Sequence, residues 1–311
     1  MKDFLSFGEP LVGLYPPQAA SVADDVPLIK TWGGDTSNFA IGVSRLGHSV
    51  SYLTAVGDDP FGRGFLALWN KNGVDTSLIT LDPKRRTGLY FVSFENKKHS
   101  FTYYREGSAT SAISIENIAP NIADEFKILH LSGISLGISG SALETGIKLM
   151  DIFQRSNRKI SFDINFRPAL WPSAKQASHI LSAAISGGVD YLEITDDEML
   201  ALGWGNTLEG LTSRFPAVGS ILLKHGPKGA SVYGEGNYFS VPAFEVEVKD
   251  TVGAGDSFDA GYLSATLDGA APPEAARFAV ATAALTCTGT GPLERMPYKK
   301  DVVLFLGASE K

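Results

Sequence analysis

From about residue 110 onward, short apolar runs alternate with longer segments in which apolar side chains recur with a helical period. In residues 143–154, for example, Leu143, Ile147, Met150 and Phe153 fall on one face of a helix. Strands that alternate with helices along a chain usually form a mostly parallel sheet with helices on both faces. Such a sheet binds ligands at the carboxyl ends of its strands. The pattern predicts strands at residues 127–131, 159–163, 190–194 and 220–224, and helices at 143–154 and 174–186.

Two earlier segments depart from this pattern. Residues 11–32 have no helical period and contain two adjacent prolines. The pattern of residues 87–105 predicts a β-hairpin with a polar turn at residues 95–98. Both segments predict a small β-sheet that stands off the main sheet as a lid. The alternative is an ordinary antiparallel edge of the main sheet.

The two faces of the predicted hairpin are both apolar. Strict alternation places Tyr90, Val92 and Phe94 on one face and Leu89, Phe91 and Ser93 on the other. A free-standing lid cannot bury both faces against its own domain, so one face would cover a ligand and the other would remain an exposed apolar patch. A two-fold partner that presents the same lid would cover this patch, and we therefore expect a homodimer joined lid to lid. The alternative is a monomer whose hairpin packs on the main sheet.

Composition narrows the class of protein. The 311 residues are 44% hydrophobic and 20% charged, which is typical of a globular chain, and we expect one α/β domain over residues 1–311. The formal net charge of −7 argues against a nucleic-acid binder, and no apolar run is long enough for a membrane span. A single cysteine, Cys287, and the absence of a signal peptide predict a cytoplasmic protein.

Residues 250–263 contain the most specific candidate for a functional site. Gly253, Ala254 and Gly255 form a turn that opens a helix, where free amides and the helix dipole make an anion site. Asp256 lies in the first helical turn. Its carboxylate would either cap the helix or accept a proton from a substrate hydroxyl.

Other motifs are absent or weak. There is no Gly-Lys dipeptide for a phosphate-binding P-loop and no GxGxxG after the first strand. Residues 133–137 match the GxSxG pattern of a serine hydrolase, with Ser135 as nucleophile. However, Gly137 and Gly140 follow, a helix is expected only from about Ser141, and the last histidine is His225, so a hydrolase is disfavoured.

Together these motifs resemble the ribokinase-like (PfkB) sugar kinases. Residues 250–263 match the family's second signature, residues 33–38 and 45–47 resemble the first, and residues 56–62 resemble a recurring family stretch. The likeness runs from residue 6 to residue 285 and implies the ribokinase-like fold. Asp35 and Thr36 depart from the usual alanine after the paired glycines, a variant similar to that of some 2-keto-3-deoxygluconate (KDG) kinases.

Three further segments resemble the substrate segments of KDG kinases: residues 88–90, 103–109 and 163–171. Two arginines, Arg105 and Arg167, lie at candidate strand ends. A guanidinium can donate two parallel hydrogen bonds to a carboxylate, so these residues favour a sugar acid over a neutral sugar. The phenol hydroxyls of Tyr90 and Tyr103 are candidate ligand contacts. The substrate-binding set implied by the resemblance is Gly33, Gly34, Asp35, Asn38, Tyr90, Tyr103, Arg105, Arg167 and Asp256.

The resemblance also implies a nucleotide side. Residues 222–230 resemble the strand and loop that run beside the ATP phosphates, and residues 195–198 take the place of an Asn-x-x-Glu motif. There Glu198 would organise Mg²⁺ through water, while Thr195 replaces the usual asparagine. A need for a monovalent cation stays open. The nucleotide-binding set is Asn165, Arg167, Thr195, Lys224, Gly226, Gly229, Gly253 and Gly255.

These inferences predict an ATP-dependent kinase that phosphorylates the primary hydroxyl of KDG to 2-keto-3-deoxy-6-phosphogluconate. Asp256 would be the base, and the amides of Gly253, Ala254 and Gly255 would stabilise charge on the phosphoryl oxygens. The first alternative is a fructokinase or ribokinase that acts on a neutral sugar. More remote alternatives are a serine hydrolase through Ser135 and a non-catalytic sugar-binding regulator.

Overall fold

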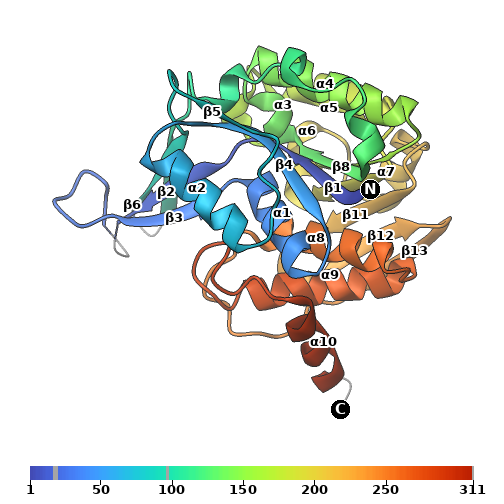
Figure 1. Cartoon of the computed structure of the whole chain (residues 1–311). Coiled ribbons are helices and arrows are strands. Elements are labelled where there is room, and N and C mark those ends of the chain that lie inside the picture. The colour runs from blue at the N-terminus through green and yellow to red at the C-terminus, as the bar shows by residue number, and fades with distance from the viewer. Residues whose placement is uncertain (17–19, 96–97, 310–311) are drawn as a thin grey trace.

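The computed structural model describes residues 1–16, 20–95 and 98–309 (Figure 1). Its largest element, within these residues, is a nine-stranded sheet in the order β13-β12-β11-β10-β9-β8-β1-β4-β5. The strands are β1 (Lys2–Phe7), β4 (Val50–Gly57), β5 (Ile79–Asp82), β8 (Phe126–Ser132), β9 (Lys159–Asp163), β10 (Tyr191–Thr195), β11 (Ser220–Lys224), β12 (Ala230–Gly234) and β13 (Asn237–Val241).

The main sheet is parallel from β5 to β11, and the two edge strands β12 and β13 are antiparallel. The prediction of a mostly parallel sheet is therefore confirmed. The four predicted strands correspond to β8, β9, β10 and β11, with β10 displaced by one residue from the expected 190–194. Their continuous apolar runs are buried on both faces, as parallel sheets covered by helices require.

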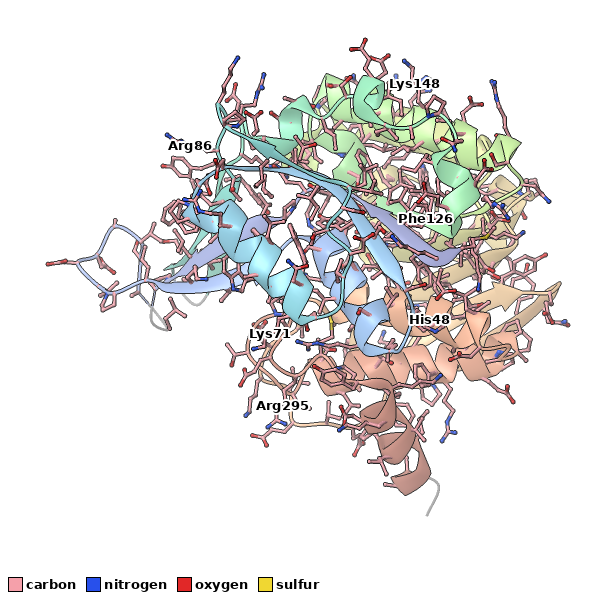
Figure 2. All side chains as sticks on the ribbon, in the orientation of Figure 1. His48, Lys71, Arg86, Phe126, Lys148 and Arg295 are labelled. Atoms are coloured by element: carbon pink, nitrogen blue, oxygen red, sulfur yellow. The ribbon has the colours of Figure 1, made fainter. Side chains whose placement is uncertain are left out.

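Helices cover both faces of the main sheet and enclose two apolar clusters (Figure 1). In Figure 2, Phe126 lies inside the packed layers, whereas Lys71 and Lys148 lie on the outer side of their helices. One face carries α3 (Gly133–Gly137), α4 (Gly140–Arg155), α5 (Ala174–Ser186), α6 (Asp196–Leu202) and α7 (Leu208–Arg214). The other carries α1 (Asp35–Arg45), α2 (Pro60–Lys71), α8 (Ala254–Leu267) and α9 (Pro272–Thr286), with α10 (Lys299–Ala308) beyond them.

The expectation that no helix begins before about Ser141 is wrong. Helix α3 begins at Gly133, directly after β8. The Ser132 hydroxyl accepts from the Ser135 amide, while the Ser135 hydroxyl accepts from the Ser132 amide, so this reciprocal cap stabilises a helix despite its glycines. Short 3₁₀ turns complete the chain at Thr110–Ala112, Ile115–Asn117, Ile122–Glu125, Pro168–Leu170 and Gly226–Lys228.

A second sheet, here called the small sheet, stands apart from the main sheet (Figure 1). Its order is β3-β2-β6-β7, from β2 (Leu11–Tyr15), β3 (Ile29–Gly33), β6 (Leu89–Glu95) and β7 (Lys98–Tyr104). It is antiparallel except for the parallel pair β2 and β6. The predicted separate sheet is confirmed in preference to an edge of the main sheet. Pro17 and the turn residues Asn96 and Lys97 lie outside the described residues.

Candidate functional site

The first turn of α8 has the backbone geometry of the anion-binding turn that the sequence predicts. Gly253 precedes the helix with φ 81°, and a Cβ atom there would lie 2.5 Å from the Cβ of Pro292, so glycine is required. The Ala254 amide donates to the Thr251 carbonyl at 3.2 Å, which removes it from the expected set of free donors. In the described part of the chain, the amides of Gly253 and Gly255 have no acceptor and remain available to an anion.

Asp256 is held by helix α1. Its Oδ2 accepts a hydrogen bond from Asn38 Nδ2 at 2.7 Å, the one hydrogen bond to this carboxylate among the described residues. The carboxylate therefore does not cap its own helix. A Cβ on Gly42 would approach that of Ala260 to 2.8 Å, so a glycine lets α1 and α8 pack closely enough for this contact. Burial, reinforced by the charge of Asp35, raises the pKa of Asp256 to about 7.

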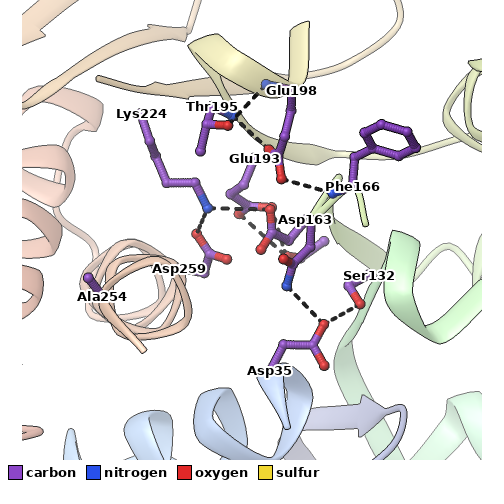
Figure 3. A network of polar contacts seen from close by, with 12 residues as sticks. Asp35, Ser132, Asp163, Phe166, Glu193, Thr195, Glu198, Lys224, Ala254 and Asp259 are labelled. Carbon is purple, nitrogen blue, oxygen red and sulfur yellow. Dashed lines mark hydrogen bonds and ion pairs between the residues drawn. The ribbon is translucent and has the colours of Figure 1, made fainter. Parts of the chain in front are cut away.

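Asp35 lies beside Asp256 at the start of α1. Its Oδ2 accepts from the Ser132 hydroxyl and from Asn165 Nδ2, the latter at 3.0 Å (Figure 3). Its Oδ1 is buried and has no hydrogen-bond partner among the described residues, as is also true of Asn38 Oδ1. Burial raises the pKa of Asp35. Two unpaired buried acceptors beside a carboxylate suit a ligand that donates several hydroxyl hydrogens.

The backbone before Asp35 connects the small sheet to this site. Strand β3 ends at Gly33, and Gly34 follows with φ 101° before α1 begins. A Cβ on Gly34 would lie 2.5 Å from the carbonyl oxygen of Glu9, so the chain passes too close for any side chain. Gly33 lies against the small sheet, since a Cβ there would be 3.3 Å from Tyr90 Oη. The paired glycines therefore bring the small sheet next to Asp35.

The aromatic residues of the small sheet are already partnered. Tyr90 is buried, and its Oη lies 2.9 Å from Tyr15 Oη. Tyr103 stands directly across the hairpin from Tyr90, with their ring centroids 6.0 Å apart, and remains 37% exposed. Burial raises the pKa of Tyr90. The Tyr90 phenol is therefore neutral over the ordinary pH range.

Arg105, at the end of β7, forms a buried ion pair with Glu9. Its guanidinium also lies over the Tyr103 ring, 5.9 Å from the centroid. The Arg105 side chain is 10% exposed and that of Glu9 is fully buried. The cation that we expected to be free for a sugar acid thus has a carboxylate partner within the protein.

Arg167 lies beside Glu198. Its Nη1 is 3.6 Å from Glu198 Oε1, and its side chain is 48% exposed. Glu198 Oε1 accepts from the Phe166 amide at 2.8 Å and Oε2 from the Thr195 amide at 2.9 Å (Figure 3). The Glu198 carboxylate therefore ties the ends of β9 and β10 together. Each of its oxygens keeps one lone pair for another donor.

Lys224 lies in a buried cluster of acids (Figure 3). Its Nζ is 3.0 Å from Asp259 Oδ1 and 3.3 Å from Asp163 Oδ1, and Glu193 stands beside Asp163 on the neighbouring strand. Burial alone would lower the pKa of Lys224, but these carboxylates raise it. Burial raises the pKa of Glu193 and of Asp259 well above the ordinary range. The ammonium lies 3.6 Å from where a Cβ on Gly255 would be, so it stands beside the first turn of α8.

The remaining predicted nucleotide residues lie in the loop after β11. Gly226 and Gly229 bound a 3₁₀ turn, and both have positive φ, 57° and 100°. A Cβ on Gly226 would meet open space, whereas one on Gly229 would lie 2.0 Å from the Val241 carbonyl oxygen. Gly226 therefore leaves an open surface near Lys224. At Gly229, the backbone around Val241 leaves no room for a side chain.

The candidate nucleophile Ser135 is buried and committed to the backbone. Its side chain is 0% exposed, and its hydroxyl donates to the Phe7 carbonyl at 2.8 Å. A nucleophilic serine must be exposed to substrate and bonded to a base. Burial and this hydrogen bond therefore exclude the hydrolase alternative. The lack of a helix, on which we first based this exclusion, is not observed.

Sequence reasoning missed several polar residues of the site. Glu193 interrupts an apolar strand, and Asp259 lies within a small-residue helix, so each carried a signal as a charge at a position that ought to be buried. Glu9 follows β1 and gave a weaker signal. Ser132 and Ser108, whose hydroxyls donate to Asp35 and Glu9, were not singled out, although Ser108 lies within residues 103–109.

Comparisons with known proteins agree on one family. The model of the pfkB family carbohydrate kinases matches residues 1–298. Fructokinase-1 of Zea mays is 31% identical and the alignment covers 96% of both chains. The 2-dehydro-3-deoxygluconokinase of Thermoproteus tenax is also 31% identical, over 99% of this chain and 95% of that protein.

A solved structure extends the likeness to the whole fold. An E. coli protein provisionally named ribokinase II, in complex with ATP and Mg²⁺, is 26% identical, with a TM-score of 0.90 over 99% of this chain and 100% of that one. Across the described ranges, no helix combines the length and apolar character needed to cross a bilayer. The match over residues 1–298 and the two relatives at 31% identity show that this chain belongs to the pfkB family of carbohydrate kinases.

Proposed function

We propose that this carbohydrate kinase transfers the γ-phosphoryl group of ATP to the primary hydroxyl of a sugar acid, and that its substrate is KDG. In the transfer, the hydroxyl oxygen forms a bond to γ-phosphorus as the bond from γ-phosphorus to the β–γ bridging oxygen breaks. The hydroxyl proton passes to Asp256, and the products are 2-keto-3-deoxy-6-phosphogluconate and ADP.

The environment of Asp256 is the observation that carries this proposal. The carboxylate lies in the same helical turn as the free amides of Gly253 and Gly255, so a base and an anion site stand next to each other. Its pKa of about 7 suits a general base at neutral pH. Asn38 fixes its orientation through a 2.7 Å hydrogen bond. Alignment and charge stabilisation are what phosphoryl transfer chiefly needs.

The acceptor sugar would occupy the space next to Asp35 and Asn38. The unpaired oxygens Asp35 Oδ1 and Asn38 Oδ1 would accept hydrogen bonds from sugar hydroxyls. Arg105 and Arg167 supply the cations that favour a carboxylate-bearing sugar. Tyr103, which is partly exposed, offers a further hydroxyl.

The nucleotide would lie toward Lys224 and Gly226, with its phosphates at the first turn of α8. The E. coli structure bound to ATP and Mg²⁺ supports this donor and this metal. Within the described residues, no group of three His, Cys, Asp or Glu side chains could hold a metal ion. Mg²⁺ would therefore bind chiefly through phosphates and water, as it often does, and the free lone pairs of Glu198 fit a water-mediated contact. The metal would supply charge neutralisation at the phosphates.

A neutral-sugar kinase is the second candidate function. One observation favours it: Glu9 already neutralises Arg105. The fructokinase relative is as similar to this chain as the sugar-acid kinase relative. ADP release measured with KDG, its galacto epimer, gluconate, fructose and ribose tests the two candidates. KDG should give the highest kcat/KM, and a preference for fructose or ribose would replace the proposal by the second candidate. A lack of ADP release with every sugar would favour a sugar-binding regulator.

We further propose that the small sheet acts as a lid and joins two copies of the chain. Its exposed aromatic residues support this, since Phe101 is 43% and Tyr104 64% exposed on opposite faces of the hairpin. A two-fold partner would cover one face, and closure over the sugar would exclude water. Light scattering at micromolar concentration should give twice the chain mass of 33.2 kDa. A mass of one chain with full activity would remove the dimer and leave the kinase assignment standing.

A further inference from the structure

Glu9 is a buried carboxylate at the junction of the main sheet and the small sheet. It follows β1, and its side chain is fully buried. Its Oε1 accepts from the Ser108 hydroxyl at 2.7 Å, and its Oε2 forms the ion pair with Arg105. A Cβ on Gly88 would approach Glu9 Oε1 to 3.0 Å. Two other segments, around Gly88 and from Arg105 to Ser108, therefore enclose this carboxylate.

The ion pair leaves one hydrogen-bond donor of Arg105 unused. Arg105 Nη2 contacts Glu9 Oε2, whereas Arg105 Nε is buried and has no hydrogen-bond partner within the described part of the chain. Buried polar atoms are rarely left without partners, so the Nε donor of this guanidinium fits an oxygen-rich ligand. Arg105 is therefore neutralised by the protein and keeps one donor for a bound molecule.

The charge around this pair matters for the choice of ligand. Glu9 and Asp35 are close enough for their charges to interact, and Asp256 lies next to Asp35. Burial raises the pKa of Glu9, while Arg105 opposes this rise by favouring the ionised carboxylate. With Glu9 ionised, its charge cancels that of Arg105, so a carboxylate ligand gains less from the guanidinium than it would from an unpaired arginine.

We propose that Glu9 is a positioning residue that sets the selectivity between sugar acids and neutral sugars through its pairing with Arg105. Glu9 holds the guanidinium in one orientation and reduces its net attraction for a carboxylate. Neutral sugars, which bind through hydroxyls alone, are little affected by this charge. This inference rests on the proposed function, because it assumes that the bound molecule is the sugar.

Glu9→Gln is the test variant, because it removes the negative charge and keeps an amide oxygen that can accept from Ser108. Arg105 then carries a net positive charge toward the ligand. The ratio of kcat/KM for KDG to kcat/KM for fructose should rise by about tenfold or more, the size expected for a buried charge-assisted contact, and mainly through a lower KM for KDG. Ser108→Ala is the matched control: it removes a hydrogen bond to Glu9 without changing the charge and should leave the ratio unchanged.

The ratio is measured with both sugars in one mixture, so the fraction of active enzyme cancels. The double variant Glu9→Gln/Arg105→Met should lose the gain, because no cation remains beside residue 9. If Glu9→Gln yields no folded protein, the double variant is compared with Arg105→Met alone, whose ratio should be lower, because the single variant leaves the Glu9 charge unpaired beside the ligand; equal ratios would overturn the role of Glu9. An unchanged ratio in a variant that phosphorylates both sugars overturns the role of Glu9. A parent that phosphorylates neither sugar contradicts the proposed function itself, which is a different result.

Discussion

Replacing Asp256 with asparagine exchanges one oxygen of the candidate site for an amide nitrogen and removes its base. The asparagine side chain keeps an amide oxygen that can accept the hydrogen bond from Asn38, which in the parent reaches Asp256 Oδ2 at 2.7 Å. The glycines of the turn are untouched. The variant should therefore fold, keep its helix and bind sugar, but lose the group that accepts the hydroxyl proton.

The expected loss of activity follows from this role. A positioned general base contributes about 10²- to 10⁴-fold, so kcat should fall by at least about 10²-fold with little change in KM. In the parent, kcat should rise about tenfold per pH unit below pH 7 and level off above it, because the pKa of Asp256 is about 7 and its ionised form is the active one. The variant should lose this dependence.

The same substitution should stabilise the protein. A carboxyl whose folded-state pKa is raised from 3.8 to about 7 stabilises the fold fully below pH 4, and this contribution is lost as the pH rises through 7. A shift of this size corresponds to at most about 4 kcal/mol, and partial exposure of the turn reduces it to about 1–2 kcal/mol. At pH 8 the variant should melt roughly 2–6 °C above the parent, and at pH 5 most of this gain should vanish.

Coupled ADP-release kinetics and thermal melts at pH 5 and 8 measure both effects. Asp268→Asn is the matched control, since Asp268 lies at the other end of the same helix and is 39% exposed. It should leave kcat unchanged. Activity of Asp256→Asn within tenfold of the parent would refute the role of Asp256 as base. A stability gain of equal size at both pH values would refute the origin of that gain in a buried charge.

Three further predictions concern the cations and the turn. Arg105→Ala and Arg167→Ala should each raise KM for a sugar acid by roughly 10- to 150-fold and for a neutral sugar by much less, in steady-state kinetics. Lys224→Met should destabilise the protein by about 3–5 kcal/mol in urea unfolding, because it leaves buried carboxylates without their cation. Adding Asp259→Leu should recover part of this loss, because it removes one of these carboxylates. Gly253→Ala should cost about 1–3 kcal/mol, since φ is 81° there, and should weaken nucleotide binding in calorimetry.

The sequence predicted the parallel sheet well because its strands are continuous apolar runs that local pattern reveals. Residues 159–163 and 220–224 match β9 and β11 at both ends. Helix α3 was missed because its glycines oppose helix formation in isolation. A reciprocal cap between Ser132 and Ser135 offsets this, and a Cβ on Gly133 would lie 2.2 Å from a neighbouring carbonyl, so the fold requires glycine there.

The site was predicted less completely, for a physical reason. The motif around Asp256 specifies local geometry, and the structure places Asn38 and Asp35 beside it. The partners of the cations come from distant segments. Arg105, for example, pairs with Glu9, which lies 96 positions earlier in the chain. Local pattern carries no information on such pairs. Two arginines could therefore be proposed as ligands from sequence, but only the fold reveals which of them is already neutralised.

A competition experiment between KDG and fructose tests the substrate assignment of this kinase. Equimolar KDG and fructose are offered to the parent enzyme with limiting ATP and Mg²⁺, and the phosphorylated products are separated and identified by mass. Product amounts then report the ratio of the two kcat/KM values. We expect phosphorylated KDG to predominate by at least about tenfold, the contribution of one charge-assisted contact to a carboxylate. Phosphorylated fructose as the main product would contradict the sugar-acid assignment.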